Sequence, residues 1–263
     1  MSLLTILTPW FAKSAIKASG YVDYALAELT EDLNDIAIPS GLPSDFFNDK
    51  FEGQEREKFE NLLLSRITSN IKQSGFNIET SAIDKTFRDF IEDYAKEHLG
   101  TLDTVSEEAL NELIGECTKA YIRYLTPDVL EMLFQNFAQF SKLLLIASAV
   151  ILVLIILTFV FLFKLCDIKE FFFYGFSSFL GAGLILGALP SYLLLSNQIS
   201  KINILSTSLY NFIVTFVSKG LTTFLVAAAI LVVLSIACLY LKSKPSFLDK
   251  YLRKAEKTLD KRG

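Results

Sequence analysis

Three uncharged runs of mostly apolar residues dominate the second half of the chain. They cover residues 143–163, 171–195 and 221–241. The hydrocarbon core of a bilayer is about 30 Å thick, so a helix that rises 1.5 Å per residue needs roughly 20 residues to cross it. Each run is long enough, and the sequence therefore predicts three transmembrane helices.

Residues 12–140 have the spacing of amphipathic helices, with apolar side chains three and four positions apart and no alternating strand pattern. This spacing predicts helices over residues 10–36, 54–74 and 80–99, and another after a capping box at 104–107. Pro127 then occupies the favoured first position of a last helix. That helix continues without a break to Lys164, and its 38 or so residues span roughly 57 Å.

The segment between the second and third runs combines one polar and one apolar face. Ile202, Leu205, Leu209, Phe212 and Phe216 recur at helical spacing, with lysine, asparagine, serine and threonine between them. Such a helix is suited to lie in the plane of a membrane surface. We therefore predict an interfacial helix over residues 200–218, with a fourth membrane span as the alternative.

The charges are distributed unevenly between the two halves, although the net charge is only −4. Residues 1–140 contain 24 acidic and 12 basic side chains, whereas residues 141–263 contain 5 acidic and 13 basic ones. Phosphate contacts require a basic surface, so the acidic half argues against nucleic acid as a partner. Eight of the basic residues lie in the tail, residues 242–263.

The basic residues also predict an orientation, because lysine and arginine collect on the cytoplasmic side of a membrane. The tail, Lys164 and Lys169 outnumber Lys142, Lys201 and Lys219 on the opposite side. The tail is therefore expected inside the cytoplasmic membrane and residues 1–140 outside it. The predicted fold class is all-α, with a helical extracytoplasmic domain followed by a three-helix transmembrane bundle over residues 141–241.

Aromatic residues mark the expected membrane interfaces. Tyr174 and Tyr240 lie near the inner ends of the second and third spans, and Tyr192 lies near the outer end of the second. An exported domain needs an export signal, and none is recognisable before residue 12. We therefore hypothesise that residues 3–11 are the outer end of an anchor helix that begins in a longer gene product, with Trp10 at the outer interface. A short interfacial helix or a buried staple is the alternative.

The second span carries a small-residue face. Gly183 and Gly187 form a GxxxG pattern, and Ser191 extends it by one turn. Small residues allow two helix backbones to approach closely within a membrane. The pattern predicts either tight packing inside this chain's own bundle or contact with a second copy.

The tail has the pattern of a basic amphipathic helix. Lys250, Arg253, Lys254 and Lys257 are expected to contact anionic lipid of the inner leaflet, each contributing on the order of 1 kcal/mol. A charge cluster that only fixes the orientation is the alternative.

Motifs for catalysis and cofactor binding were sought throughout the chain. It contains no Walker, dinucleotide-binding, HExxH or GxSxG motif, and the predicted spans contain no charged residue or histidine. Its single histidine, His98, has no accompanying nucleophile signature, and its three cysteines form no CxxC pair. We therefore predict that the protein is not an enzyme or a pump and that it binds no cofactor or metal.

Some sequence features resemble a loosely defined group of membrane proteins from Gram-positive bacteria. These features are Ser19-Gly20-Tyr21 with Tyr24, the segment Pro39-Ser40-Gly41-Leu42-Pro43, and the three spans. The resemblance implies an N-terminal anchor, a helical outer domain and three further spans. The anchor is the one part of this plan that we do not recognise in the sequence. The resemblance implies no known activity and assigns no site residues.

Three functions follow from these patterns. The first is a non-enzymatic membrane protein whose outer helical domain binds or senses a protein or envelope ligand. The second is an accessory or scaffold subunit of a membrane complex, which contacts a protein partner or a second copy through Gly183 and Gly187. The third is a transporter or lipid-handling protein. Membrane lipids are expected partners in all three.

Overall fold

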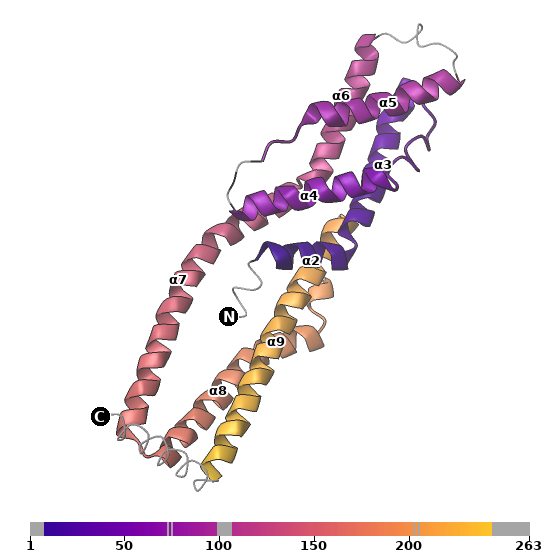
Figure 1. The fold of residues 1–263 in the computed structure, drawn as a ribbon. Helices are drawn as coiled ribbons and strands as arrows, with labels where there is room; N and C mark the ends of the chain where they lie inside the picture. Colours follow the sequence, from indigo (N-terminus) through magenta and orange to yellow (C-terminus); the bar gives the residue numbers. More distant parts are fainter. Residues whose placement is uncertain are drawn as a thin grey trace. The chain divides into compact units, whose positions relative to one another are not determined.

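The computed structural model describes residues 8–72, 74, 76–98, 107–201, 203–204 and 206–243. Within these residues the fold is all-α, with eight α-helices labelled α2 to α9 and two short 3₁₀ helices (Figure 1). The chain divides into two compact units. Among the described residues, the N-terminal unit comprises 8–142 and 203–216, and the apolar unit comprises 143–201 and 217–243.

The N-terminal unit begins with two helices where the sequence predicted one. Helix α2 covers Pro9–Ser19 and α3 covers Tyr21–Ala37, and the chain breaks between them at Gly20, whose φ is +64°. This left-handed conformation is accessible to glycine at little cost. The Ser19 hydroxyl supports the break, because it donates to the Ile16 carbonyl and accepts from the Tyr21 amide. The prediction of one helix over residues 10–36 was therefore wrong.

The remaining helices of the N-terminal unit lie close to their predicted positions. Helix α4 covers Gln54–Lys72, α5 covers Thr80–His98 and α6 covers Glu107–Leu125, and a short 3₁₀ helix, Ile38–Ser40, follows α3. The capping box begins at Thr104, which lies outside the described residues. Together the helices enclose a core that is rich in aromatic rings, including Phe47, Phe51, Phe59, Phe87 and Tyr121.

Three long helices follow, as predicted. Helix α7 covers Asp128–Leu165, α8 covers Ile168–Leu195 and α9 covers Thr207–Ser243. Their segments Leu145–Leu165, Glu170–Leu195 and Thr207–Ser243 are long and apolar enough to cross a membrane. The structure thus confirms the all-α fold with three candidate spans after a helical N-terminal part. On which side of a membrane that part lies stays a prediction.

The segment expected to form an interfacial helix is organised differently. Most of the described residues of 200–218 belong to the 3₁₀ helix Ile199–Lys201 and to the first turns of α9, and residues 203, 204 and 206 lie between these two elements. The amphipathic spacing has another cause, because Phe212 and Phe216 lie in the core of the N-terminal unit. The Phe212 ring packs edge-on against Tyr21, and Phe216 packs in the same way against Phe11. Protein, rather than a membrane surface, covers this apolar face.

Candidate functional site

A cleft of about 250 Å³ lies within the N-terminal unit, between α4 and α5. Its walls come from the two helices and from the segment that leads into α5, and Tyr121 of α6 also lines it. The lining is mostly apolar, with a few polar groups, as in many sites that bind small molecules. The side chains used below are Phe51, Glu55, Lys58, Glu79, Phe87 and Tyr121.

Three aromatic rings form one part of the cleft. The ring centroids of Phe51, Phe87 and Tyr121 lie 6.1 to 6.2 Å from one another. All three residues are buried in the core of the unit. Close packing on several sides holds these rings in place, so they form a pre-arranged apolar surface.

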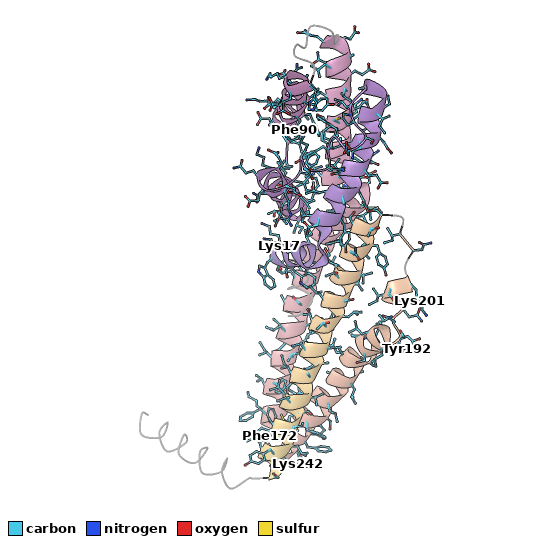
Figure 2. All side chains as sticks on the ribbon, turned by 90° about the vertical axis from the view of Figure 1, so that its right-hand side faces the viewer. Lys17, Phe90, Phe172, Tyr192, Lys201 and Lys242 are labelled. Carbon is cyan, nitrogen blue, oxygen red and sulfur yellow. The ribbon has the colours of Figure 1, made fainter. Side chains whose placement is uncertain are left out.

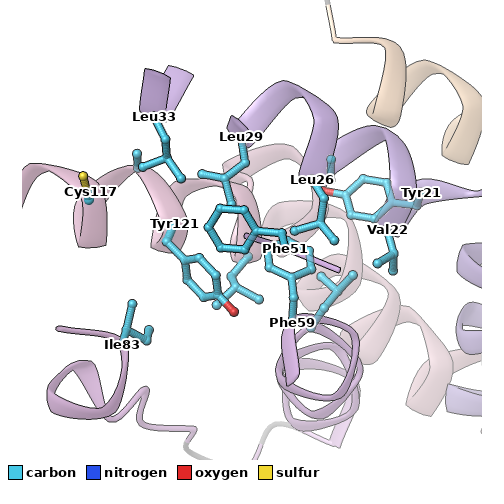
Figure 3. Packing of buried hydrophobic residues seen from close by; sticks show 14 of the residues in the cluster. Tyr21, Val22, Leu26, Leu29, Leu33, Phe51, Phe59, Ile83, Cys117 and Tyr121 are labelled. Atoms are coloured by element: carbon cyan, nitrogen blue, oxygen red, sulfur yellow. The ribbon is translucent and has the colours of Figure 1, made fainter. Parts of the chain in front are cut away.

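The Tyr121 hydroxyl is the most informative polar group of the cleft. Tyr121 is only 6% exposed, and Figure 3 shows its ring beside Phe51 with the hydroxyl directed away from α6. Within the described residues, no protein group bonds this hydroxyl, and its oxygen is not among the buried polar atoms without a partner, so it reaches the surface of the cleft, where water can bond it. Burial, together with the nearby Glu55 carboxylate, raises the pKa of Tyr121 well above its ordinary value of 10. The hydroxyl therefore stays protonated and can both donate and accept a hydrogen bond.

Three charged side chains complete the lining, and their sum is negative. The Lys58 ammonium lies 2.5 Å from the Glu55 carboxylate, one turn away on α4. Glu79 contributes a second carboxylate from the segment before α5. Lys58 is largely exposed, whereas Glu55 is mostly covered.

A second polar cluster joins α3 to the start of α9. The Ser208 amide donates to Glu28 Oε1 at 3.1 Å, and the hydroxyls of Ser206 and Ser208 donate to Oε2 at 3.0 and 2.9 Å. The Ser206 hydroxyl also accepts from the Leu209 amide. Because the first amides of a helix have no partner within it, Glu28 acts as a cap supplied by another helix. This role is structural.

A similar contact links α3 to the end of α6. The Tyr124 hydroxyl donates to Asp32 Oδ2 at 2.7 Å, and the Arg123 guanidinium lies 2.5 Å from the same oxygen. Burial and the hydrogen bond to Asp32 raise the pKa of Tyr124.

The described residues contain no group of histidine, cysteine and acidic side chains that would hold a metal ion.

The structure places the predicted helix-packing residues within the apolar unit. A Cβ added to Gly183 would lie 3.2 Å from the Ala228 carbonyl oxygen, and one added to Gly187 would lie 3.3 Å from the Ala228 Cβ. Both glycines therefore face α9 of the same chain. Ser191 is half-buried further along α8.

The predicted interface residues are exposed at their helix surfaces. Trp10 is exposed on the first turn of α2, and Tyr174, Tyr192 and Tyr240 are exposed in the apolar unit. Figure 2 shows Phe172 and Lys242 at one end of the apolar unit and Tyr192 towards the other. The Lys242 ammonium lies 4.2 Å from the centre of the Phe173 ring. This contact fits a lysine whose charge lies at a membrane surface and whose stem lies along apolar groups.

The other candidates are the basic residues of the tail, the single histidine and a buried cysteine. The expected lipid contacts Lys250, Arg253, Lys254 and Lys257 lie outside the described residues. His98 is exposed and stacks on the Tyr94 ring. Burial raises the pKa of the Cys117 thiol to about 12, which leaves it protonated and unreactive at neutral pH.

Sequence reasoning missed the cleft altogether. Tyr121 lies within the helix predicted after the capping box, at the spacing of an apolar position, where a tyrosine is read as part of the core. Nothing in the spacing indicates that Tyr121 lines a cleft, because the cleft depends on the packing of α4 and α5. No protein-family model, curated protein or solved structure matches this chain.

Proposed function

We propose that the protein is a non-enzymatic integral membrane protein whose N-terminal unit binds a ligand on the outer face of the cell membrane. The observation that carries this proposal is the cleft between α4 and α5, which combines three packed aromatic rings with the Glu55 carboxylate and the Tyr121 hydroxyl. A bound ligand would bury apolar surface against the rings and bond the hydroxyl in place of water.

The helix arrangement supports a role in sensing. Helices α7 and α9 each contribute residues to the N-terminal unit and continue into a candidate span. The first turns of these two long helices belong to the N-terminal unit. A ligand that stabilises this unit therefore stabilises those turns as well. Lipid is the natural partner of the apolar unit, because most of the candidate-span surface is exposed.

The proposed orientation is tested by cysteine labelling in intact cells. A background with Cys117→Ala, Cys166→Ser and Cys238→Ser receives one new cysteine at the exposed Ser81 of α5, or at Ser246 in the tail. We expect a membrane-impermeant maleimide to label Ser81→Cys before permeabilisation and Ser246→Cys only after it. The reverse result would place the N-terminal unit in the cytoplasm and direct the search to intracellular ligands.

Ligand binding in the cleft is tested by filling it. Ala82 is exposed and lines the cleft, so Ala82→Trp adds a large ring there. A small-molecule collection is screened for compounds that raise the thermal stability of the protein in neutral-lipid nanodiscs. We expect some compounds to stabilise the original protein and not the Ala82→Trp variant. Equal responses from both proteins would contradict the proposal.

A further inference from the structure

We infer that the cleft of the N-terminal unit binds a small primary amine with an apolar body. In this arrangement the ligand's ammonium group donates to the Glu55 carboxylate and the Tyr121 hydroxyl oxygen. Its apolar body packs on Phe51 and Phe87. The inference rests on the proposed ligand-binding function and names the chemical class of the ligand.

The charges of the cleft favour a cation. Glu55 and Glu79 supply two carboxylates, and Lys58 is the one cationic side chain among the lining residues. The Lys58–Glu55 pair at 2.5 Å shows that this carboxylate accepts an ammonium group in this position. A carboxylate has about four acceptor sites, so one ammonium does not saturate it. Lys58 is also largely exposed, so water weakens its ion pair with Glu55.

The aromatic rings and the hydroxyl favour the same class of ligand. The faces of phenylalanine and tyrosine rings attract cations, and the rings bury apolar carbon atoms as well. The Tyr121 hydroxyl remains protonated, and its oxygen can accept a hydrogen bond from an ammonium group. An anionic ligand would instead meet two carboxylates, and a neutral one would gain no charge–charge attraction from Glu55 and Glu79.

Three probes of similar size separate a cationic, a neutral and an anionic ligand: 2-phenylethylamine, 2-phenylethanol and 3-phenylpropionate. The full chain is placed in phosphatidylcholine nanodiscs with ¹³C-labelled isoleucine methyl groups, and empty nanodiscs correct for partitioning. Ile83 lines the cleft, and its methyl signal, assigned with Ile83→Val, reports binding there. We expect the amine to shift this signal with a dissociation constant at least tenfold lower than that of either analogue.

Two cleft variants and a matched control test the contacts. Glu55→Gln should weaken binding of the amine about tenfold or more and abolish the preference for it over 2-phenylethanol. Tyr121→Phe should weaken it about three- to tenfold. Glu57→Gln removes an exposed carboxylate of the same helix outside the cleft and should leave binding unchanged. Methyl spectra of the ligand-free variants verify that each has folded.

The outcomes distinguish the inference from the proposed function. If the alcohol or the acid shifts the Ile83 signal at the same or lower concentration than the amine does, the cleft binds ligands but the amine assignment is wrong. An effect of Glu57→Gln equal to that of Glu55→Gln would also overturn the assignment, because the preference would then reflect the general charge of α4. If none of the probes shifts the Ile83 signal, the result counts against both the assignment and the cleft as a binding site.

Discussion

The two units use the same apolar residue types in opposite ways. In the N-terminal unit, Phe47, Phe59 and Leu63 are fully buried. In the apolar unit, Ile185 and Leu195 are 80% and 87% exposed, and no residue in the most apolar window of the α7 span is buried. Apolar residues avoid water rather than seek one another, so the second pattern is the one expected where lipid replaces water.

The packing of the units differs for the same reason. Aromatic rings fill the N-terminal core, because removing large apolar surfaces from water drives its folding. In the apolar unit, Gly183 and Gly187 of α8 approach Ala228 of α9. Lipid tails are as apolar as leucine, so helices in a membrane gain more from close backbone contact than from large side chains.

The largest effect is predicted for removing a ring from the N-terminal core, and removing a ring from the apolar unit is the comparison. The Phe47 ring packs against the rings of Phe46, Phe51 and Phe87, so Phe47→Ala should destabilise the protein by about 3–5 kcal/mol. Phe161→Ala removes an exposed ring of the apolar unit and should cost less than about 0.5 kcal/mol in lipid. Denaturant unfolding in nanodiscs measures both, and equal losses would contradict the comparison.

Enlarging a glycine of α8 should have the next largest effect. A Cβ at Gly183 would lie 3.1 Å from Val232 Cγ2, so Gly183→Leu should destabilise the apolar unit by about 1–3 kcal/mol. Gly181→Leu is the matched control, because a Cβ there meets no atom within 4 Å. The measurement is the thermal stability of each variant in bicelles. If both variants lose the same stability, close packing at Gly183 is not the cause.

Alkaline pH should weaken the N-terminal unit. Burial, Glu28 and Tyr124 raise the pKa of Tyr21 in the folded protein above its ordinary value of 10. The unfolded chain therefore loses this proton first, and the stability from neutral Tyr21 is complete below pH 10 and falls as pH rises above it. The slope is at most about 1.4 kcal/mol per pH unit. Unfolding at pH 9 and pH 11 should show a smaller loss for Tyr21→Phe than for the original protein.

The smallest effect is expected from removing the cap that α3 supplies to α9. Glu28→Ala leaves the Ser208 amide and two hydroxyls without their acceptor, and should cost about 1 kcal/mol. Glu31→Ala changes an exposed carboxylate of the same helix and should cost much less. Hydrogen exchange of the first α9 amides provides the local measurement. If both variants increase exchange equally, Glu28 does not act as the cap.

Much of the fold could be predicted because its signals are local. Proline at residue 127 marks the start of α7, and uninterrupted apolar runs mark the three long helices. The break at Gly20 was missed because the apolar spacing continues through it, and only the left-handed backbone reveals the turn. The position of Phe212 was also missed, since an apolar helix face looks the same whether protein or lipid covers it. The cleft depends on residues far apart in the sequence, from Phe51 to Tyr121, and such pairings leave no periodic trace.

The exposed side chain of Trp10 has a practical consequence. It is the chain's one tryptophan, and it sits on the first turn of α2 beside Phe11, whose ring packs on Phe216. The protein therefore carries an intrinsic fluorophore at a single known place, with no label to introduce. A blue-shifted emission that brominated lipids quench would report a headgroup environment around α2, whereas quenching by iodide alone would report open water.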